Sequence, residues 1–152
     1  MEFDWLQLRI LGLVAVAMGL GALIGFEREL ADKPAGLRTH MIVAGAASLF
    51  VALGDALVKH FDLGMSHEIL RTDPIRIIEA VITGVSFLGA GTIIRGDSNR
   101  KIEGLTTAAS ILLAAAVGVC VALSKIILAL GVAGLALITL RGLGAAERWL
   151  QK

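Results

Sequence analysis

The sequence predicts an all-α membrane protein with five transmembrane helices. The chain has 152 residues, of which 57% are hydrophobic and 18% are charged, and its mean hydropathy is +0.83. A soluble domain of this size carries about a quarter charged residues and less than half apolar ones. The charged residues are also clustered, which leaves long stretches without any. These observations exclude a disordered chain, a disulfide-stabilised secreted domain and an ordinary soluble enzyme.

Five stretches without Asp, Glu, Lys or Arg predict the five helices. They contain 17, 16, 15, 21 and 15 residues, and they follow Arg9, Arg38, Glu79, Glu103 and Lys125. A helix that crosses ~30 Å of hydrocarbon needs roughly 17–25 mainly apolar residues, and a charge near its end can reach the interface. We therefore expect one transmembrane domain, residues 1–152, with helices at about 5–26, 37–57, 75–94, 105–123 and 126–143. Transmembrane strands would need alternating segments of about 10 residues, which are not present.

Local signals support the boundaries of these helices. Trp5 is typical of an interface anchor at the start of the first helix. Asp32-Lys33-Pro34-Ala35-Gly36 and Gly96-Asp97-Ser98-Asn99 are typical of turns. Thr72-Asp73-Pro74 predicts a helix start, because a capping side chain precedes a proline in the first turn. A tight turn is expected at Ser124-Lys125.

The distribution of Lys and Arg predicts the orientation in the membrane. With five spans, nine of these residues lie on the side of the C-terminus and five on the other side. The positive-inside rule then places the N-terminus outside and the C-terminus in the cytoplasm. The acidic start of the chain is unlike a signal peptide, so the first apolar segment is expected to remain as a span.

Several functions are excluded by features that the sequence lacks. The net charge is +1 and no basic block is interleaved with aromatic residues, which argues against nucleic-acid binding. The one cysteine, Cys120, allows neither an intramolecular disulfide nor a thiolate metal site. No phosphate-binding loop, nucleophile motif or zinc-type histidine arrangement is present, so we expect no enzymatic activity and no cofactor.

Small residues at four-residue spacing predict how the helices pack. Close approach of backbones through glycine and alanine drives helix association in lipid. The glycines expected in such contacts are Gly21, Gly25, Gly84, Gly89, Gly91, Gly104 and Gly118. Pure packing is the simpler interpretation. The alternative is that glycines near Gly89 expose backbone carbonyls to a bound or permeating species.

Charged residues at the predicted cytoplasmic end of the first helix are candidates for a functional role. Glu27 lies one helical turn beyond Leu23 and one residue from the helical phase of Gly21 and Gly25. We expect it to face inward with Arg28 or Arg38 as its partner. A solvated collar of charges is the alternative. Thr39 and His40 follow Arg38 at the start of the second helix. His40 is expected to be an ordinary interfacial histidine, and a proton-sensing role is the alternative.

Two carboxylates near the outer boundary, Asp55 and Glu79, are the candidates for a metal site. Mg²⁺ prefers carboxylates together with retained waters. The simpler interpretation of Glu79 is a local ion pair with Arg76, three residues earlier.

Hydroxyl side chains near the helix ends are further candidates. Thr83, Thr106, Thr107 and Ser110 are expected to bond back to their own helix or to join neighbouring helices. The segment Glu103-Gly104-Leu105-Thr106-Thr107 is expected to cap the fourth helix. The carboxylate of Glu103 near the helix N-terminus would be stabilised by the helix dipole.

Three segments resemble the signatures of the MgtC/SapB membrane protein family, in the expected order. They are Gly21-Ala22-Leu23-Ile24-Gly25-Phe26-Glu27-Arg28-Glu29 with Ala35-Gly36-Leu37-Arg38-Thr39, then Thr83-Gly84-Val85-Ser86-Phe87-Leu88-Gly89-Ala90-Gly91, then Gly104-Leu105-Thr106-Thr107-Ala108-Ala109-Ser110. The resemblance implies a five-helix protein of the bacterial inner membrane with a cytoplasmic C-terminus. Many members append a soluble cytoplasmic domain, and only the membrane domain is expected here.

The resemblance also implies a link to growth at low magnesium and to survival of pathogens in host cells. The first hypothesis is a non-enzymatic protein of Mg²⁺ homeostasis that acts by binding other membrane proteins or further copies of itself in the lipid bilayer. The second is a small oligomeric transporter or channel for Mg²⁺ or another cation, in which Mg²⁺ is a ligand or the transported ion.

Overall fold

The structure, a computed structural model, consists of five helices and one very short hairpin. It describes residues 5–62, 74–95 and 102–150. The helices are α1 (Trp5–Leu30), α2 (Leu37–Asp62), α3 (Pro74–Ala90), α4 (Leu105–Ala122) and α5 (Ile126–Leu150). The two-residue strands β1 (Ile94–Arg95) and β2 (Ile102–Glu103) pair antiparallel, with Ile94 opposite Glu103. The all-helical fold with five helices therefore agrees with the prediction from sequence.

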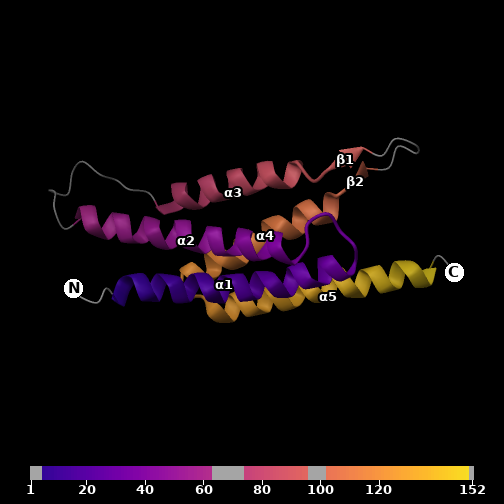
Figure 1. The fold of residues 1–152 in the computed structure, drawn as a ribbon, viewed down its shortest axis with the longest axis horizontal. Coiled ribbons are helices and arrows are strands. Elements are labelled where there is room, and N and C mark those ends of the chain that lie inside the picture. The colour runs from indigo at the N-terminus through magenta and orange to yellow at the C-terminus, as the bar shows by residue number, and fades with distance from the viewer. Residues whose placement is uncertain (1–4, 63–73, 96–101, 151–152) are drawn as a thin grey trace.

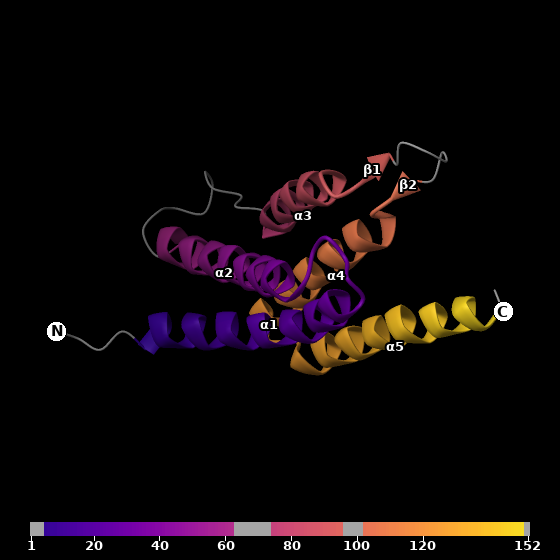
Figure 2. The same cartoon turned by 45° about the vertical axis from the view of Figure 1, so that its right-hand side comes forward.

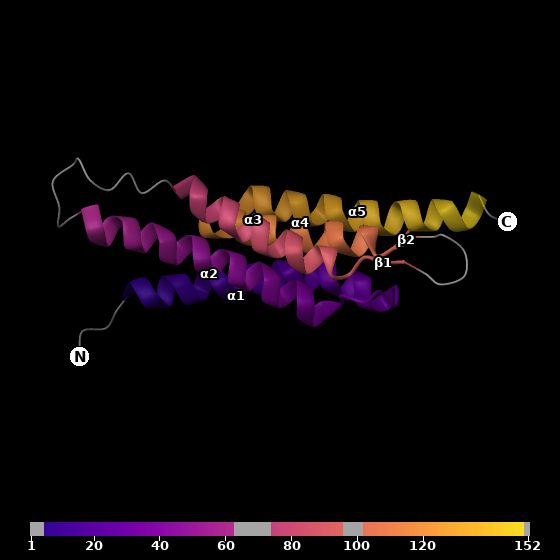
Figure 3. The same ribbon diagram turned by 90° about the horizontal axis from the view of Figure 1, so that it is seen from above.

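The helices run back and forth along the long axis of the molecule (Figure 1). The α1–α2 connection, the β1–β2 hairpin and the C-terminal end of α5 lie at one end, and α1 begins at the other end (Figures 1 and 3). Helix α4 is central because it packs against α1, α2, α3 and α5. Helix α3 lies at the edge and packs on α4 and α2, as Figure 2 shows.

Within the residues that the structure describes, three of the helices are long and apolar enough to cross a membrane. These candidate spans are Trp5–Leu30, Leu37–Leu57 and Leu105–Ala122, and Ile126–Gly142 is a shorter apolar helix. Many large apolar side chains point outward, including Ile127, Phe87 and Trp5, which are 89%, 85% and 75% exposed. Exposure of so much apolar surface to water is unfavourable, whereas contact of this surface with lipid is favourable. The protein is therefore a membrane protein.

The first helix continues beyond its expected end, through the charged residues to Leu30. It stops in a Schellman motif, in which Lys33 N–H donates to the Arg28 carbonyl and Asp32 N–H donates to the Glu29 carbonyl. Asp32 has a φ of 52°, the left-handed conformation that this motif requires. The same motif ends α4, where Ser124 has a φ of 58° and Lys125 N–H donates to the Cys120 carbonyl. The tight turn expected at Ser124-Lys125 is therefore confirmed.

Other boundaries also differ from the prediction. Helix α3 begins at Pro74, as expected, but ends at Ala90 because the chain turns there into β1. Helix α2 continues to Asp62 and α5 to Leu150. The turn predicted at residues 96–99, like residues 72 and 73, lies outside the described residues.

The cap of α4 lies within the predicted segment, residues 103–107. Glu103 belongs to β2, and the N-cap residue is Gly104, which makes no side-chain capping hydrogen bond. Gly104 has a φ of 89°, and a Cβ there would overlap the Thr92 carbonyl oxygen. The close approach of the hairpin to the start of α4 therefore requires glycine at this position.

Small residues fill the centre of the helix bundle. One core cluster joins α1, α2, α4 and α5 and contains Ala17, Leu20, Ile24, Ala44, Ala114, Val117, Val121, Ala129, Ala133 and Ala136. Six of these ten residues are alanines, which let helix backbones approach closely. This dense packing holds the ends of α1, α2 and α4 together, where the buried polar residues lie.

Candidate functional site: a buried polar junction of α1, α2 and α4

Three glycine contacts bring α2 close to both of its main neighbours, α1 and α4. A Cβ at Gly21 of α1 would lie 2.5 Å from the His40 carbonyl oxygen, and one at Gly25 would lie 2.8 Å from the Gly36 carbonyl oxygen. A Cβ at Gly118 of α4 would overlap the Ala44 carbonyl oxygen. These positions allow only glycine without movement of the backbone. The small residues therefore set the distances at which the polar side chains of α1, α2 and α4 meet.

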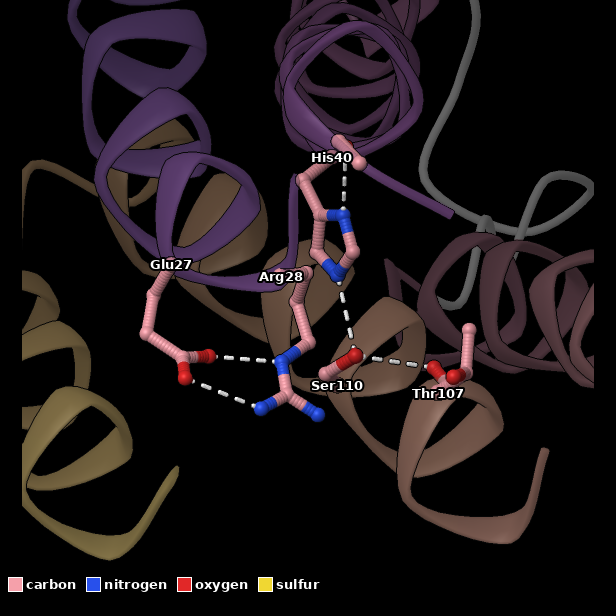
Figure 4. A network of polar contacts seen from close by, with 6 residues as sticks. Glu27, Arg28, His40, Thr107 and Ser110 are labelled. Atoms are coloured by element: carbon pink, nitrogen blue, oxygen red, sulfur yellow. Dashed lines mark hydrogen bonds and ion pairs between the residues drawn. The ribbon is translucent and has the colours of Figure 1, made fainter. Parts of the chain in front are cut away.

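Five buried residues form what we call the polar junction: Glu27, Arg28, His40, Thr107 and Ser110. Glu27 and Arg28 come from the last turns of α1, His40 from the first turn of α2, and Thr107 and Ser110 from the first turns of α4. Figure 4 shows Arg28 between Glu27 and the His40–Ser110 pair.

Glu27 and Arg28 form a closed ion pair inside the protein. Arg28 Nε donates to Glu27 Oε2 at 2.6 Å, and Arg28 Nη2 donates to Glu27 Oε1 at 3.0 Å. The two side chains are only 7% and 5% exposed. A buried carboxylate needs a cation with good geometry, because a lone buried charge would cost several kcal/mol. Glu27 faces inward, as expected, and its partner is Arg28, whereas Arg38 is exposed.

His40 connects α2 to α4. Its Nδ1 lies 2.8 Å from the Gly36 carbonyl oxygen, and its Nε2 lies 2.9 Å from Ser110 Oγ. Ser110 Oγ also lies 2.9 Å from the carbonyl oxygen of Thr107, one turn back on α4. The imidazole is fully buried. The expectation of an ordinary interfacial histidine is therefore wrong, because α1 and α4 cover this end of α2.

The sequence contains a signal that identifies the buried face of α2. Gly36, His40, Ala44 and Ser48 follow one another at four-residue spacing, which places them on one side of a helix. His40, Ala44 and Ser48 are all 0% exposed. The hydroxyl of Ser110 is likewise in helical phase with Thr107. The position of His40 in this stripe of small residues is the signal that indicates its burial.

Glu29 has a structural role that the sequence did not indicate. Its Oε2 accepts a hydrogen bond from Leu37 N–H at 2.7 Å. This N–H belongs to the first turn of α2, which has no acceptor within its own helix. A carboxylate at this position also interacts favourably with the positive end of the helix dipole. Glu29 of α1 therefore fixes the start of α2 and the approach of His40 to α4.

The other predicted site residues lie outside the polar junction. Arg38, Asp55, Glu79, Thr83, Glu103 and Thr106 are exposed, and Thr39 is half-buried. Thr83 donates a hydrogen bond to the Glu79 carbonyl at 2.8 Å, as expected for a hydroxyl that bonds back to its own helix. Arg76 and Glu79 do not form the expected ion pair in the described part of the chain.

Asp55 and Glu79, the candidates for a metal site, lie on different helices. Among residues 5–62, 74–95 and 102–150, no three His, Cys, Asp or Glu side chains are close enough to hold a metal ion.

The predicted packing glycines fall into two groups. Gly21, Gly25, Gly104 and Gly118 make the close contacts given above, and a Cβ at Gly89 would lie 3.5 Å from Ala108, in ordinary contact. Gly84 differs, because a Cβ built there would have no neighbour within 4 Å. Gly91 meets only the carbonyl oxygens of Phe87 and Leu88, which belong to α3 itself. We call the exposed side of α3 that carries Gly84 its outer face. A residue with a Cβ at Gly84 would meet no other part of the described chain.

Comparison with known proteins gives the family. The model of the MgtC family matches residues 14–149. The chain belongs to the MgtC family. This match contains all five residues of the polar junction, and it confirms the resemblance found in the sequence.

Curated relatives in the MgtC family come from several bacteria. An uncharacterized protein of Haemophilus influenzae is 34% identical over 96% of this chain and 60% of its own length. The Escherichia coli K12 protein named "Putative magnesium transporter YhiD" is 40% identical over 74% of the chain and 49% of its own length. Protein MgtC of Brucella abortus is 38% identical over 70% of the chain and 39% of its own length. The chain thus spans about half the length of these relatives. No solved structure matches it.

Proposed function

We propose that this chain is a multi-pass protein of the bacterial inner membrane that takes part in Mg²⁺ homeostasis without catalysing a reaction. In this proposal it acts by binding other membrane proteins or further copies of itself. The family match and the magnesium-related name of YhiD support the link to magnesium. For a chain with five spans, the Lys and Arg distribution supports a cytoplasmic C-terminus.

The observation that carries the proposal is the uncovered outer face of α3. Ala80, Thr83 and Gly84 are exposed on this face, and Gly84 has open space beside it. Elsewhere in the same chain, small residues at this spacing let helices pack closely, as at Gly21 and Gly118. A face with small residues and a hydroxyl is suited to a contact with another transmembrane helix. The closed Glu27–Arg28 pair has a structural role in this account, since each carboxylate oxygen already has a donor.

The proposal is tested with a substitution that fills the open space beside Gly84. A Gly84→Ile chain and the unchanged chain are reconstituted in liposomes, and self-association is followed by energy transfer between labelled copies. Growth of the source bacterium at low Mg²⁺ is measured in parallel, after its own gene has been replaced by each variant. Gly131→Ile is the matched control, because Gly131 is also exposed and has no neighbour within 4 Å.

We expect Gly84→Ile to lose both growth at low Mg²⁺ and association, while the helix content and the thermal unfolding temperature are kept. The control should retain all of these. Normal growth and normal association of Gly84→Ile would contradict the proposal.

Transport of Mg²⁺ or another cation by an oligomer is the second candidate function. The name of YhiD and the buried carboxylate of Glu27 favour it. Its test is Mg²⁺ uptake into liposomes that contain a fluorescent Mg²⁺ indicator. Uptake that Glu27→Ala or Glu79→Ala abolishes would replace the binding proposal with transport. A folded protein that moves no Mg²⁺ would exclude transport.

A further inference from the structure

His40 and Ser110 take part in three polar contacts. A neutral histidine and the serine hydroxyl together supply only two hydrogens for them. The Gly36 carbonyl oxygen can only accept, so His40 Nδ1, at 2.8 Å, must carry a hydrogen and donate it. The remaining contacts are Nε2 to Ser110 Oγ and Ser110 Oγ to the Thr107 carbonyl, both 2.9 Å. The serine hydroxyl has a single hydrogen to serve these two contacts.

Two arrangements of hydrogens keep the bond from His40 Nδ1 to the Gly36 carbonyl at the same heavy-atom positions. In the neutral histidine, Ser110 donates to His40 Nε2, and its contact with the Thr107 carbonyl has no hydrogen. In the charged histidine, Nε2 carries a second hydrogen and donates it to Ser110 Oγ, and Ser110 then donates to the Thr107 carbonyl. All three contacts are hydrogen bonds only in the charged form. The change requires rotation of one hydroxyl and no movement of a helix.

We propose that His40 is a reversible proton-binding site, at which Ser110 transfers its hydrogen bond from His40 Nε2 to the Thr107 carbonyl when the proton binds. The proton comes from water and forms the new N–H bond with the lone pair of Nε2. The hydroxyl of Ser110 keeps its own hydrogen throughout. The proposal does not depend on whether the protein transports Mg²⁺ or binds partners.

The charged groups around His40 suit a site that changes its net charge. Helix α1 places Glu27 and Arg28 beside it, and these charges compensate each other through their two hydrogen bonds. Helix α4 contributes hydroxyls and contains no Asp, Glu, Lys, Arg or His. The junction is therefore neutral when His40 is neutral and positive when it is charged. Proton binding changes the electric field at the contact of α1, α2 and α4.

Among the side chains that the structure describes, the remaining charged groups of the packed helices are exposed. Arg38 of α2 and Glu29 of α1 are both exposed. Helix α3 carries Arg76 and Glu79, and its Ile77 contacts Gly54. Gly54 lies 14 residues along α2 from His40, which corresponds to about 21 Å. Helix α5 contributes Arg141, which is exposed.

The test observes the imidazole of His40 by nitrogen NMR. The chain contains three histidines, so His60→Gln and His67→Gln leave His40 as the only one. This chain, labelled with ¹⁵N-histidine, is placed in lipid nanodiscs and followed as the pH is changed. We expect the neutral form to carry its hydrogen on Nδ1, because of the Gly36 carbonyl. At lower pH both nitrogens should become protonated.

Two serine variants then distinguish the proposed site from an isolated histidine. Hydrogen bonds to a charged group are stronger than those to a neutral one. Ser110→Ala should therefore favour the neutral form and move the midpoint of the change to lower pH by about one unit. Ser48→Ala is the matched control, since Ser48 is equally buried on α2 and its hydroxyl has no hydrogen-bond partner among the described residues. It should leave the midpoint unchanged.

Three results would overturn the proposal. One is a His40 that stays neutral at every pH at which the protein remains folded. Another is a neutral form with its hydrogen on Nε2, a result that needs no serine variant and stands even if Ser110→Ala does not fold. The third is a midpoint that Ser110→Ala does not move.

Discussion

Gly118 of α4 lies against the backbone carbonyl of Ala44 of α2, and a methyl group at Gly118 would overlap that carbonyl oxygen. The contact lies one helical turn along α2 from His40. Because backbone atoms occupy the space, no side-chain rotation can relieve the overlap. The distance between α2 and α4, and with it the His40–Ser110 contact, therefore depends on glycine at this position.

Gly118→Ala should destabilise the protein by about 1–3 kcal/mol, the usual cost of inserting a carbon into a packed interior. The measurement is unfolding in detergent followed by circular dichroism. Gly131→Ala is the control, because nothing lies within 4 Å of a Cβ there. It should be neutral, or stabilising by up to about 1 kcal/mol through helix propensity. Equal effects of the two substitutions would show that α2 and α4 do not pack as described.

Glu27→Gln should destabilise the fold by about 3–5 kcal/mol, since it leaves the buried guanidinium of Arg28 without its anion. Glu29→Gln should cost less than about 1 kcal/mol, because the amide oxygen can still accept from Leu37 N–H. Unfolding in urea and detergent, measured side by side on the two variants, checks the difference. The two glutamates lie two residues apart, so equal tolerance would contradict the inward position of Glu27.

The double variant Glu27→Gln with Arg28→Gln should be more stable than Glu27→Gln alone. Replacing both members of a buried ion pair removes the unpaired charge that makes the single substitution severe. The coupling between the two positions, obtained from the four unfolding free energies, should be about 1–3 kcal/mol and favourable. Additive effects of the two substitutions would mean that Glu27 and Arg28 do not form a buried pair.

Ser124→Gly should stabilise the protein by about 1 kcal/mol. Ser124 has a φ of 58° at the end of α4, a conformation that disfavours residues with a Cβ. Ser124→Val should have the opposite effect, because a β-branched side chain tolerates this conformation poorly. The change in thermal unfolding temperature of the two variants gives the sign. Destabilisation by glycine would show that α4 does not end in a Schellman motif.

Much of the polar junction can be deduced from the chain once the buried face of each helix is known. Glu27 lies three residues after Ile24 and seven after Leu20, which are both buried on α1, and the structure places it inward with them. His40 shares the phase of Ala44 and Ser48, yet its place near a helix end favoured an interfacial position. Whether an end of a helix is covered depends on its neighbours, and here α1 and α4 cover the start of α2.

Composition and charge spacing determined that this chain forms apolar helices separated by short polar connections, because a helix satisfies its own backbone hydrogen bonds and needs only local sequence to form. Tertiary structure decided which polar groups meet. Arg28 rather than Arg38 pairs with Glu27, Glu29 caps α2, and Ser110 reaches His40 across 70 residues of sequence. Such pairings depend on how closely two backbones approach, and that distance is set by glycines and alanines on different helices.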